Sequence, residues 1–175
     1  MGNAAAVSTI STASVSIEEL YAFLYAEARA LDDRDFDHWL TFYDENVRFW
    51  MPAWDDLDTL TEDPANEMSL IFYDSRLGLE DRVFRIKTDR SSATSLPEPR
   101  TGHNISNIEV LQAEGTVLKV RFNWVTFNYR YHQTDSYWGT SFYTIDTISG
   151  RPLITEKRVV LKNDQIHHVV DIYHI

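Results

Sequence analysis

The sequence contains no cysteine. Without thiolates the chain can form no disulfide, and it has no ligands for a cysteine-type zinc site or for a cysteine-held iron–sulfur cluster. This absence is typical of a reducing compartment, so we expect a cytoplasmic location. Basic residues are also scarce, because 16 Lys and Arg stand against 27 Asp and Glu, a net charge of −11. Nucleic acids and anionic membranes attract clustered positive charge, so neither is an expected partner.

Long apolar runs and catalytic motifs are missing as well. No stretch approaches the roughly 20 apolar residues that span a bilayer. There is no GxSxG, no P-loop and no GxGxxG motif, so a nucleophile elbow or a phosphate-binding loop is not predicted.

Aromatic residues, in contrast, are abundant, with five Trp, nine Tyr and nine Phe among 175 residues. Aromatic side chains bury large areas in cores and at interfaces. The length suits one domain. We predict a flexible tail over residues 1–15, where small and polar residues dominate, and a single domain over residues 16–175.

Two helices are predicted at the start of this domain. Ser16 and Glu19 form a capping box, and apolar residues then recur at three- and four-residue steps to Leu31. Asp35 opens a second helix, which the pattern extends to Tyr43 and Asp44. A third helix is predicted over residues 78–87, with Leu79, Val83 and Phe84 on its inner side.

The rest of the domain is predicted to be strand. β-branched and aromatic residues separated by turn signals indicate strands at 47–51, 68–73, 103–113, 116–131, 136–148, 153–162 and 166–173. Short connections make such strands mainly antiparallel, and helices followed by a meander indicate an α+β fold. In the 116–131 segment the apolar parity changes after Trp124. This change predicts either a bulge near Val125 or a strand whose two faces are both covered, and in both cases a strongly curved sheet.

The segment HHVVDIYH at residues 167–174 offers two histidines and a carboxylate, the ligand types of a non-haem iron site. In a strand, however, His167 and Asp171 would lie about 13 Å apart. No metal site is therefore predicted, and no catalytic or cofactor-binding residue is assigned.

The aromatic strands 121–131 and 137–143 carry Tyr, Trp and Arg, which are enriched at interface hot spots. The candidates for contacts with another protein are Trp124, Tyr129, Tyr131, Trp138 and Tyr143. Core packing is the alternative interpretation for each.

Several long segments resemble the small (β) subunit of Rieske-type aromatic-ring-hydroxylating dioxygenases, most closely the benzoate and toluate 1,2-dioxygenase branch. The resemblance covers residues 17–175 and is carried by LDDRDFDHWL (31–40), FWMPAWDDLDTLTEDP (49–64), LEDRVFRIKTDRSSAT (79–94), RTGHNISNIEV (100–110) and VVLKNDQIHHVVDIYHI (159–175). It implies a cystatin/NTF2-like cone with N-terminal helices packed on a strongly curved, mainly antiparallel sheet. It also implies a structural subunit assembled with a large α subunit, usually as an α3β3 hexamer with contacts between β subunits. The Rieske [2Fe-2S] cluster and the mononuclear non-haem Fe(II) would lie on the α subunit, and a separate reductase would supply electrons.

Two other interpretations remain at this point. One is a free-standing acid–base enzyme of the same fold, an isomerase or dehydratase, in which His38, Tyr43, Asp44 and His103 would be the reactive groups. It predicts an enclosed pocket that holds a group with a displaced pKa. The other is a self-assembling module that binds a small apolar ligand. The subunit interpretation predicts a small or filled cavity and a large apolar surface away from it.

Overall fold

The structure is a computed structural model, and it describes residues 15–55, 58–88, 97–148, 150–163 and 165–175. The predicted flexible tail, apart from Val15, lies outside the described residues. Within the described part of the chain, no helix is long and apolar enough to cross a membrane.

The first helix, α1 (Ile17–Asp32), begins at the predicted capping box. The Ser16 hydroxyl accepts a hydrogen bond from the Glu19 amide, and the Glu19 carboxylate accepts one from the Ser16 amide. These bonds satisfy two donors that would otherwise be unpaired at the helix start. The predicted apolar stripe is confirmed from Leu20 onward, since Leu20, Leu24, Ala28 and Leu31 are buried, whereas its first member, Ile17, is exposed.

The second helix, α2 (Phe36–Leu40), is shorter than predicted. The prediction that Tyr43 and Asp44 close this helix is wrong, because Tyr43 is the first residue of strand β1 (Tyr43–Pro52). The main-chain oxygen of Phe42 accepts a hydrogen bond from the amide of Ile154. Pairing with a distant strand therefore ends the helix where the local apolar spacing would continue it.

The remaining elements are β2 (Ser69–Tyr73), α3 (Arg76–Lys87), β3 (Arg100–Glu114), β4 (Val117–Arg130), β5 (Gln133–Asp146), β6 (Leu153–Leu161) and a 3-10 turn, η1 (Ile172–His174). The six strands form one sheet in the order β2-β1-β6-β5-β4-β3. Only the β1–β6 pair is parallel, so the predicted mainly antiparallel α+β fold is confirmed. In α3, Leu79 and Val83 are buried as predicted, but Phe84 is exposed and the prediction for it is wrong.

Strand β4 contains no bulge near Val125, which corrects one of the two options for this segment. It pairs with β5 without a register shift, and the irregularities lie on β3, between Ser106 and Glu109 and between Val110 and Gln112. The inward positions of β4 therefore change from apolar Phe122 and Trp124 to polar Thr126 and Asn128, while Phe127 and Tyr129 face outward.

The predicted last strand, residues 166–173, is also wrong. This segment has no strand pairing and ends in η1, which Asp171 caps through its side chain. The guanidinium of Arg82 on α3 holds the Asp171 carboxylate, so a tertiary ion pair decides this conformation rather than the local abundance of β-branched residues.

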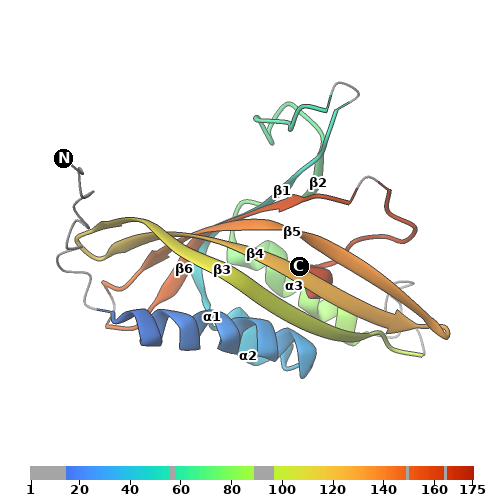
Figure 1. Ribbon diagram of the computed structural model, residues 1–175, viewed down its shortest axis with the longest axis horizontal. Helices are drawn as coiled ribbons and strands as arrows, with labels where there is room; N and C mark the ends of the chain where they lie inside the picture. The colour runs from blue at the N-terminus through green and yellow to red at the C-terminus, as the bar shows by residue number, and fades with distance from the viewer. Residues whose placement is uncertain (1–14, 56–57, 89–96, 149, 164) are drawn as a thin grey trace, which may run out of the picture.

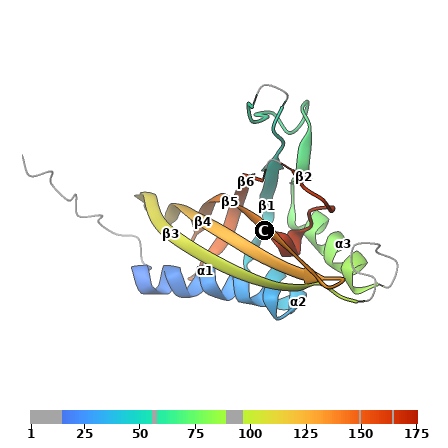
Figure 2. The same cartoon turned by 45° about the vertical axis from the view of Figure 1, so that its right-hand side comes forward.

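The three helices pack on the concave face of the sheet and share one core with it. Figure 1 shows α1 running along strands β3 and β4, with the β1–β2 hairpin projecting away from the helices. In Figure 2 the C-terminal turn, in dark red, lies between α3 and the sheet. The opposite face of the sheet, the outer face, carries no packed helix among the described elements.

Candidate functional site

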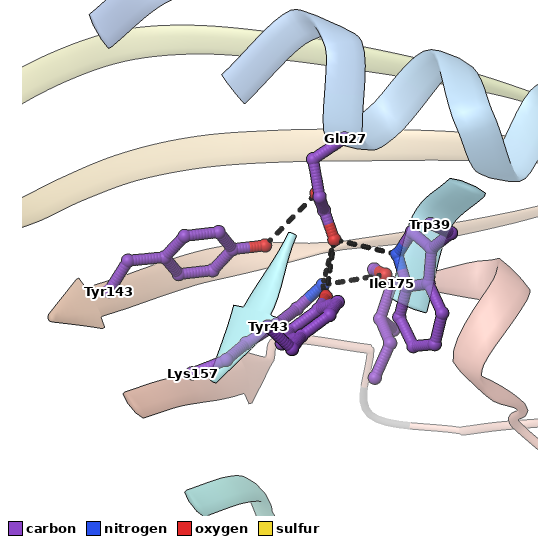
Figure 3. Close-up of polar contacts among 6 residues, drawn as sticks. All are labelled: Glu27, Trp39, Tyr43, Tyr143, Lys157 and Ile175. Atoms are coloured by element: carbon purple, nitrogen blue, oxygen red, sulfur yellow. Dashed lines mark hydrogen bonds and ion pairs between the residues drawn. The ribbon is translucent and has the colours of Figure 1, made fainter. Parts of the chain in front are cut away.

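A buried polar cluster lies in the middle of the concave face (Figure 3). Glu27 occupies a position of α1 that faces the core, one turn after Leu24. Around it lie Trp39 from α2, Tyr43 at the start of β1, Tyr143 on β5 and Lys157 on β6. We refer to these five residues as the Glu27 cluster.

The Glu27 carboxylate accepts hydrogen bonds from the four other side chains of the cluster. Oε1 accepts from Trp39 Nε1 at 2.9 Å, from the Tyr43 hydroxyl at 2.5 Å and from Lys157 Nζ at 3.1 Å. Oε2 accepts a longer bond, 3.4 Å, from the Tyr143 hydroxyl. Lys157 Nζ also donates to the main-chain oxygen of Ile175 at 3.2 Å.

The charges in this cluster are compensated within it. Burial alone would raise the pKa of Glu27, but the nearby ammonium of Lys157 and the surrounding donors hold that pKa below its usual range. Burial lowers the pKa of Lys157, and Glu27 opposes this effect. Burial and the adjacent Glu27 carboxylate raise the pKa of both tyrosines well above the usual value. Glu27 is thus ionised near neutral pH and both tyrosines are protonated.

The Glu27 cluster is closed to solutes. Glu27 is 3% exposed and Lys157 is 1% exposed, while Phe49 and Tyr143 place their rings about 5 Å from the ammonium group. A substrate cannot reach these groups without opening the core. The perturbed pKa values therefore belong to a structural ion pair and not to an accessible acid–base site.

The four residues suggested for an acid–base enzyme do not come together. Tyr43 belongs to the Glu27 cluster, whereas His38 is exposed on α2 and meets the Phe42 ring edge to face. Asp44 accepts a local hydrogen bond from the Asn46 amide. His103 is on β3, where it faces α1.

His103 forms a second, partly buried polar pair with Asp32 at the end of α1. Its Nδ1 lies 2.5 Å from Asp32 Oδ1, and its amide donates to Asp32 Oδ2 at 2.9 Å. Burial would raise the pKa of Asp32, but the hydrogen bonds and charge of His103 bring it below its usual range. Asp32 was not predictable as the partner of His103 from the sequence, since 71 residues separate them.

The C-terminal segment is anchored by residues that the metal hypothesis had singled out. Arg82 Nε donates to Asp171 Oδ1 at 2.8 Å, and a second, shorter bond joins the other oxygen to the guanidinium. The Asp171 amide donates to His174 Nδ1 at 3.0 Å, and the His174 ring stacks on Tyr137 at 4.4 Å between ring centres. Within the described residues, no group of three or more His, Asp or Glu side chains is arranged to hold a metal ion.

The five candidate contact residues fall into two groups. Trp124 and Tyr143 are buried in the core, where the alternative interpretation places them. Tyr129, Tyr131 and Trp138 are 41%, 55% and 47% exposed, respectively. Tyr129 and Trp138 share the outer face of the β4–β5 hairpin with exposed Phe127, and Tyr131 lies at the hairpin end.

Sequence reasoning missed a second feature of the outer face. The Arg158 guanidinium lies 5.4 Å from the centre of the Trp50 ring and 5.7 Å from that of Phe142. A cation placed over an aromatic ring at this distance is attracted to the ring face. The short β5–β6 connection could have indicated that Phe142 and Arg158 lie on neighbouring strands, but nothing local shows that β1, with Trp50, pairs with β6.

Comparison with known proteins agrees with this architecture. The family described as ring hydroxylating beta subunit matches residues 26–168. The chain is 57% identical to the toluate 1,2-dioxygenase subunit beta of Pseudomonas putida, covering 93% of this chain and 99% of the relative. It is equally identical to the benzoate 1,2-dioxygenase subunit beta of Acinetobacter baylyi, covering 93% and 95%.

Solved structures show the same fold. The beta subunit of the benzoate 1,2-dioxygenase of Burkholderia mallei superposes with a TM-score of 0.79 at 49% identity, over 94% of this chain and all of that one. An NTF2-like protein with a cystatin-like fold from Novosphingobium aromaticivorans has a TM-score of 0.58 at 11% identity, over 85% and 82% of the two chains. The second likeness supports the NTF2-like fold alone. The family match and the relatives at 57% identity establish that the chain belongs to the family of ring-hydroxylating dioxygenase β subunits.

Proposed function

We propose that this chain is the structural β subunit of the terminal oxygenase component of a dioxygenase that converts an aromatic carboxylate, of the benzoate or toluate kind, to a cis-dihydrodiol. The names of the relatives support the substrate class, because toluate, benzoate and 2-halobenzoate dioxygenases are all among them at 55–57% identity. Residues 16–175 act as one domain, in the cytoplasm.

The observation that carries this proposal is the contrast between a closed polar centre of the cone and an open outer face. The Glu27 cluster fills the middle of the cone with an ion pair that solutes do not reach. The outer face presents exposed Phe127, Tyr129 and Trp138 on long paired strands. Exposed aromatic surface rimmed by polar groups is typical of a protein–protein contact.

The residues of this chain do not fit the redox centres of such an enzyme. A Rieske [2Fe-2S] cluster needs two Cys and two His ligands, and the sequence has no Cys. We therefore place the cluster and the mononuclear Fe(II) on a large α subunit. A separate NADH-dependent reductase contacts the assembled complex and supplies electrons.

We assign the outer face of the β4–β5 hairpin to contacts with partner subunits in an α3β3 hexamer, in which β subunits also touch each other. Trp138 lies opposite Val125 and diagonal to Phe127, so these side chains form a continuous apolar patch. Aromatic side chains of this kind provide much of the binding energy at interfaces.

Co-expression with the candidate α subunit tests the proposal. We expect a hexamer by mass measurement, iron only when the α subunit is present, and formation of cis-dihydrodiol from benzoate only by the complex with its reductase. Dihydrodiol formation by the chain alone, or an α subunit that is fully active and assembled without it, would contradict the proposal.

Two matched variants test the contact face. Trp138→Ser is expected to weaken assembly by a factor of about ten or more, as at interface hot spots. Phe84→Ser removes an aromatic residue of α3 that is even more exposed, 69% against 47% for Trp138, and is expected to leave assembly unchanged. The reverse result would move the contact to the helical side.

A further inference from the structure

Four buried polar atoms have no hydrogen-bond partner within the described part of the chain: His103 Nε2, Trp124 Nε1, Thr126 Oγ1 and Asn128 Oδ1. Three of them belong to successive inward positions of β4, and His103 is the cross-strand neighbour of Thr126. Buried polar atoms are nearly always paired. A row of unpaired atoms on one patch of the concave face therefore points to a missing partner.

A cavity opens at the end of this row. It has a volume of about 440 Å³ and is lined by residues of α3, of the end of the β4–β5 hairpin and of the C-terminal turn. Asn128, which is 4% exposed, lines it. The cavity is thus within the size range of small-molecule sites and contains a buried acceptor without a donor.

The charged groups in the cavity wall are already compensated. Arg82 is held by the Asp171 carboxylate through two bonds. Arg130 Nε donates to the main-chain oxygen of Pro97 at 2.9 Å. The His168 Nε2 atom lies 3.7 Å from Asp135 Oδ2. Asp171 does not itself line the cavity, but with it two guanidinium groups are balanced by two carboxylates. The cavity therefore favours a ligand without net charge.

The hydrogen-bonding groups of the cavity wall can pair with a ligand that has both a donor and an acceptor. Asn128 Oδ1 needs a donor. Burial lowers the pKa of His174 to about 4, so the ring is neutral near pH 7. Because His174 Nδ1 accepts from the Asp171 amide, its proton lies on Nε2, which can donate. A hydroxyl group supplies one donor and accepts as well, so it can satisfy both residues.

Apart from Gln133, the other walls are formed by aromatic and apolar side chains. They include the Tyr131 and Tyr173 rings, Pro99 and Val169. Tyr131 and His132 form the hairpin turn with positive φ angles of 51° and 64°, where Asn and Gly are preferred. The turn thus places an aromatic ring at the cavity mouth at some conformational cost.

We propose that this cavity is a binding site for a small neutral hydroxylated ring compound, a phenol or a ring diol, whose hydroxyl group bonds to Asn128 and His174 and whose ring lies against Tyr131 and Tyr173. Such a site is a property beyond the proposed subunit function. Because phenol binding is measured on the full chain alone, binding can fail while subunit assembly succeeds, and assembly can fail while phenol binds.

Phenol is the probe, and calorimetric titration at pH 7 is the measurement. Anisole has the same ring but no hydroxyl donor, and benzoate has the ring with a negative charge. We expect phenol to bind about tenfold more tightly than either, which corresponds to one net hydrogen bond or slightly more. No binding of phenol, or equal binding of phenol and anisole, would overturn the proposal.

Two variants locate the site. Asn128→Leu is expected to weaken phenol binding about tenfold or more without lowering the thermal midpoint, because it removes an unpaired acceptor. Asn123→Leu makes the same change on the outer face of β4 and should leave binding unchanged. Val169→Trp, at a position that is 76% exposed, should block the cavity mouth without affecting the core. Undiminished phenol binding in both Asn128→Leu and Val169→Trp would also overturn the proposal.

Discussion

The concave face of the sheet is polar in two places, and these places are built in opposite ways. In the Glu27 cluster, one carboxylate accepts hydrogen bonds from four side chains, and no polar side-chain atom of the cluster is buried without a partner. In the row that ends at Asn128, four buried atoms lack partners and a cavity opens beside them. The first place lies under α1 in the middle of the sheet, and the second lies toward the hairpin end of β4.

This difference separates a structural use of buried charge from a binding use. Buried ion pairs tolerate little change, because removing one partner leaves an uncompensated charge in a medium of low polarity. Buried polar atoms without partners lower stability unless a ligand or water completes them. The two places should therefore respond to substitution with effects of different size and even of different sign.

The largest effect is expected for Lys157→Met. It leaves the Glu27 carboxylate buried without its cation, and such a loss costs about 3–5 kcal/mol. Urea denaturation at pH 7 measures it. Lys119→Met, on an exposed position of β4, is the matched control and should change stability by less than about 0.5 kcal/mol. A loss below about 1 kcal/mol for Lys157→Met would show that the ion pair contributes little to stability.

A second pair of variants compares two hydrogen bonds to the same carboxylate. Tyr43→Phe removes a donor at 2.5 Å and Tyr143→Phe removes one at 3.4 Å. Bonds to charged groups contribute about 1.5–3 kcal/mol, and bonds weaken with distance. We expect a loss of about 2 kcal/mol for Tyr43→Phe and a clearly smaller one for Tyr143→Phe, by urea denaturation. Equal losses would mean that distance does not rank these two bonds.

Much of the frame of both places was predictable from the sequence. The α1 stripe, the capping box and the four long strands β3 to β6 follow from local periodicity, which short connections convert into a meander. Glu27 itself left a signal, because it occupies a core-facing position between Leu24 and Leu31. Lys157 has the same inward direction as Val159 and Leu161 on β6. Each was visible as a charge on an apolar face, but their pairing over 130 residues was not.

The failures have a common cause in tertiary contacts. Tyr43 continues the helical spacing of Trp39, yet pairing with β6 makes it the first residue of a strand. Val169 and Val170 favour a strand, yet the Arg82–Asp171 pair turns the segment into an irregular anchor. The parity change in β4 suggested a bulge. The register instead turns polar Thr126 and Asn128 inward, and local sequence could not show that space remained beside them.

His174 gives the cavity end a pH dependence between pH 4 and 6.5. The unfolded pKa is about 6.5 and burial lowers the folded value to about 4, so the unfolded state binds the proton first as the pH falls. The stability that His174 contributes is complete above pH 6.5 and is lost progressively toward pH 4, about 1 kcal/mol of it by pH 5.5. Urea denaturation at pH 7 and 5.5 measures the loss. His174→Gln should remove most of the difference, and an unchanged difference would assign it to another group.

The smallest effect is a difference in sign between two buried threonines. Thr126 Oγ1 has no partner, whereas Thr140 Oγ1 lies 3.2 Å from the side-chain oxygen of Asn123 and donates to it. Valine has nearly the shape of threonine without the hydroxyl. Thr140→Val should therefore lower the free energy of unfolding by about 1 kcal/mol, because it breaks a bond and leaves an acceptor unpaired. Thr126→Val should raise it by up to about 1 kcal/mol, since it removes a polar atom that is buried without compensation.

Thermal or urea denaturation of both threonine variants measures the two changes in the free energy of unfolding. A loss for Thr126→Val as large as that for Thr140→Val would mean that an ordered water already completes the row, which would leave only Asn128 to contact a ligand.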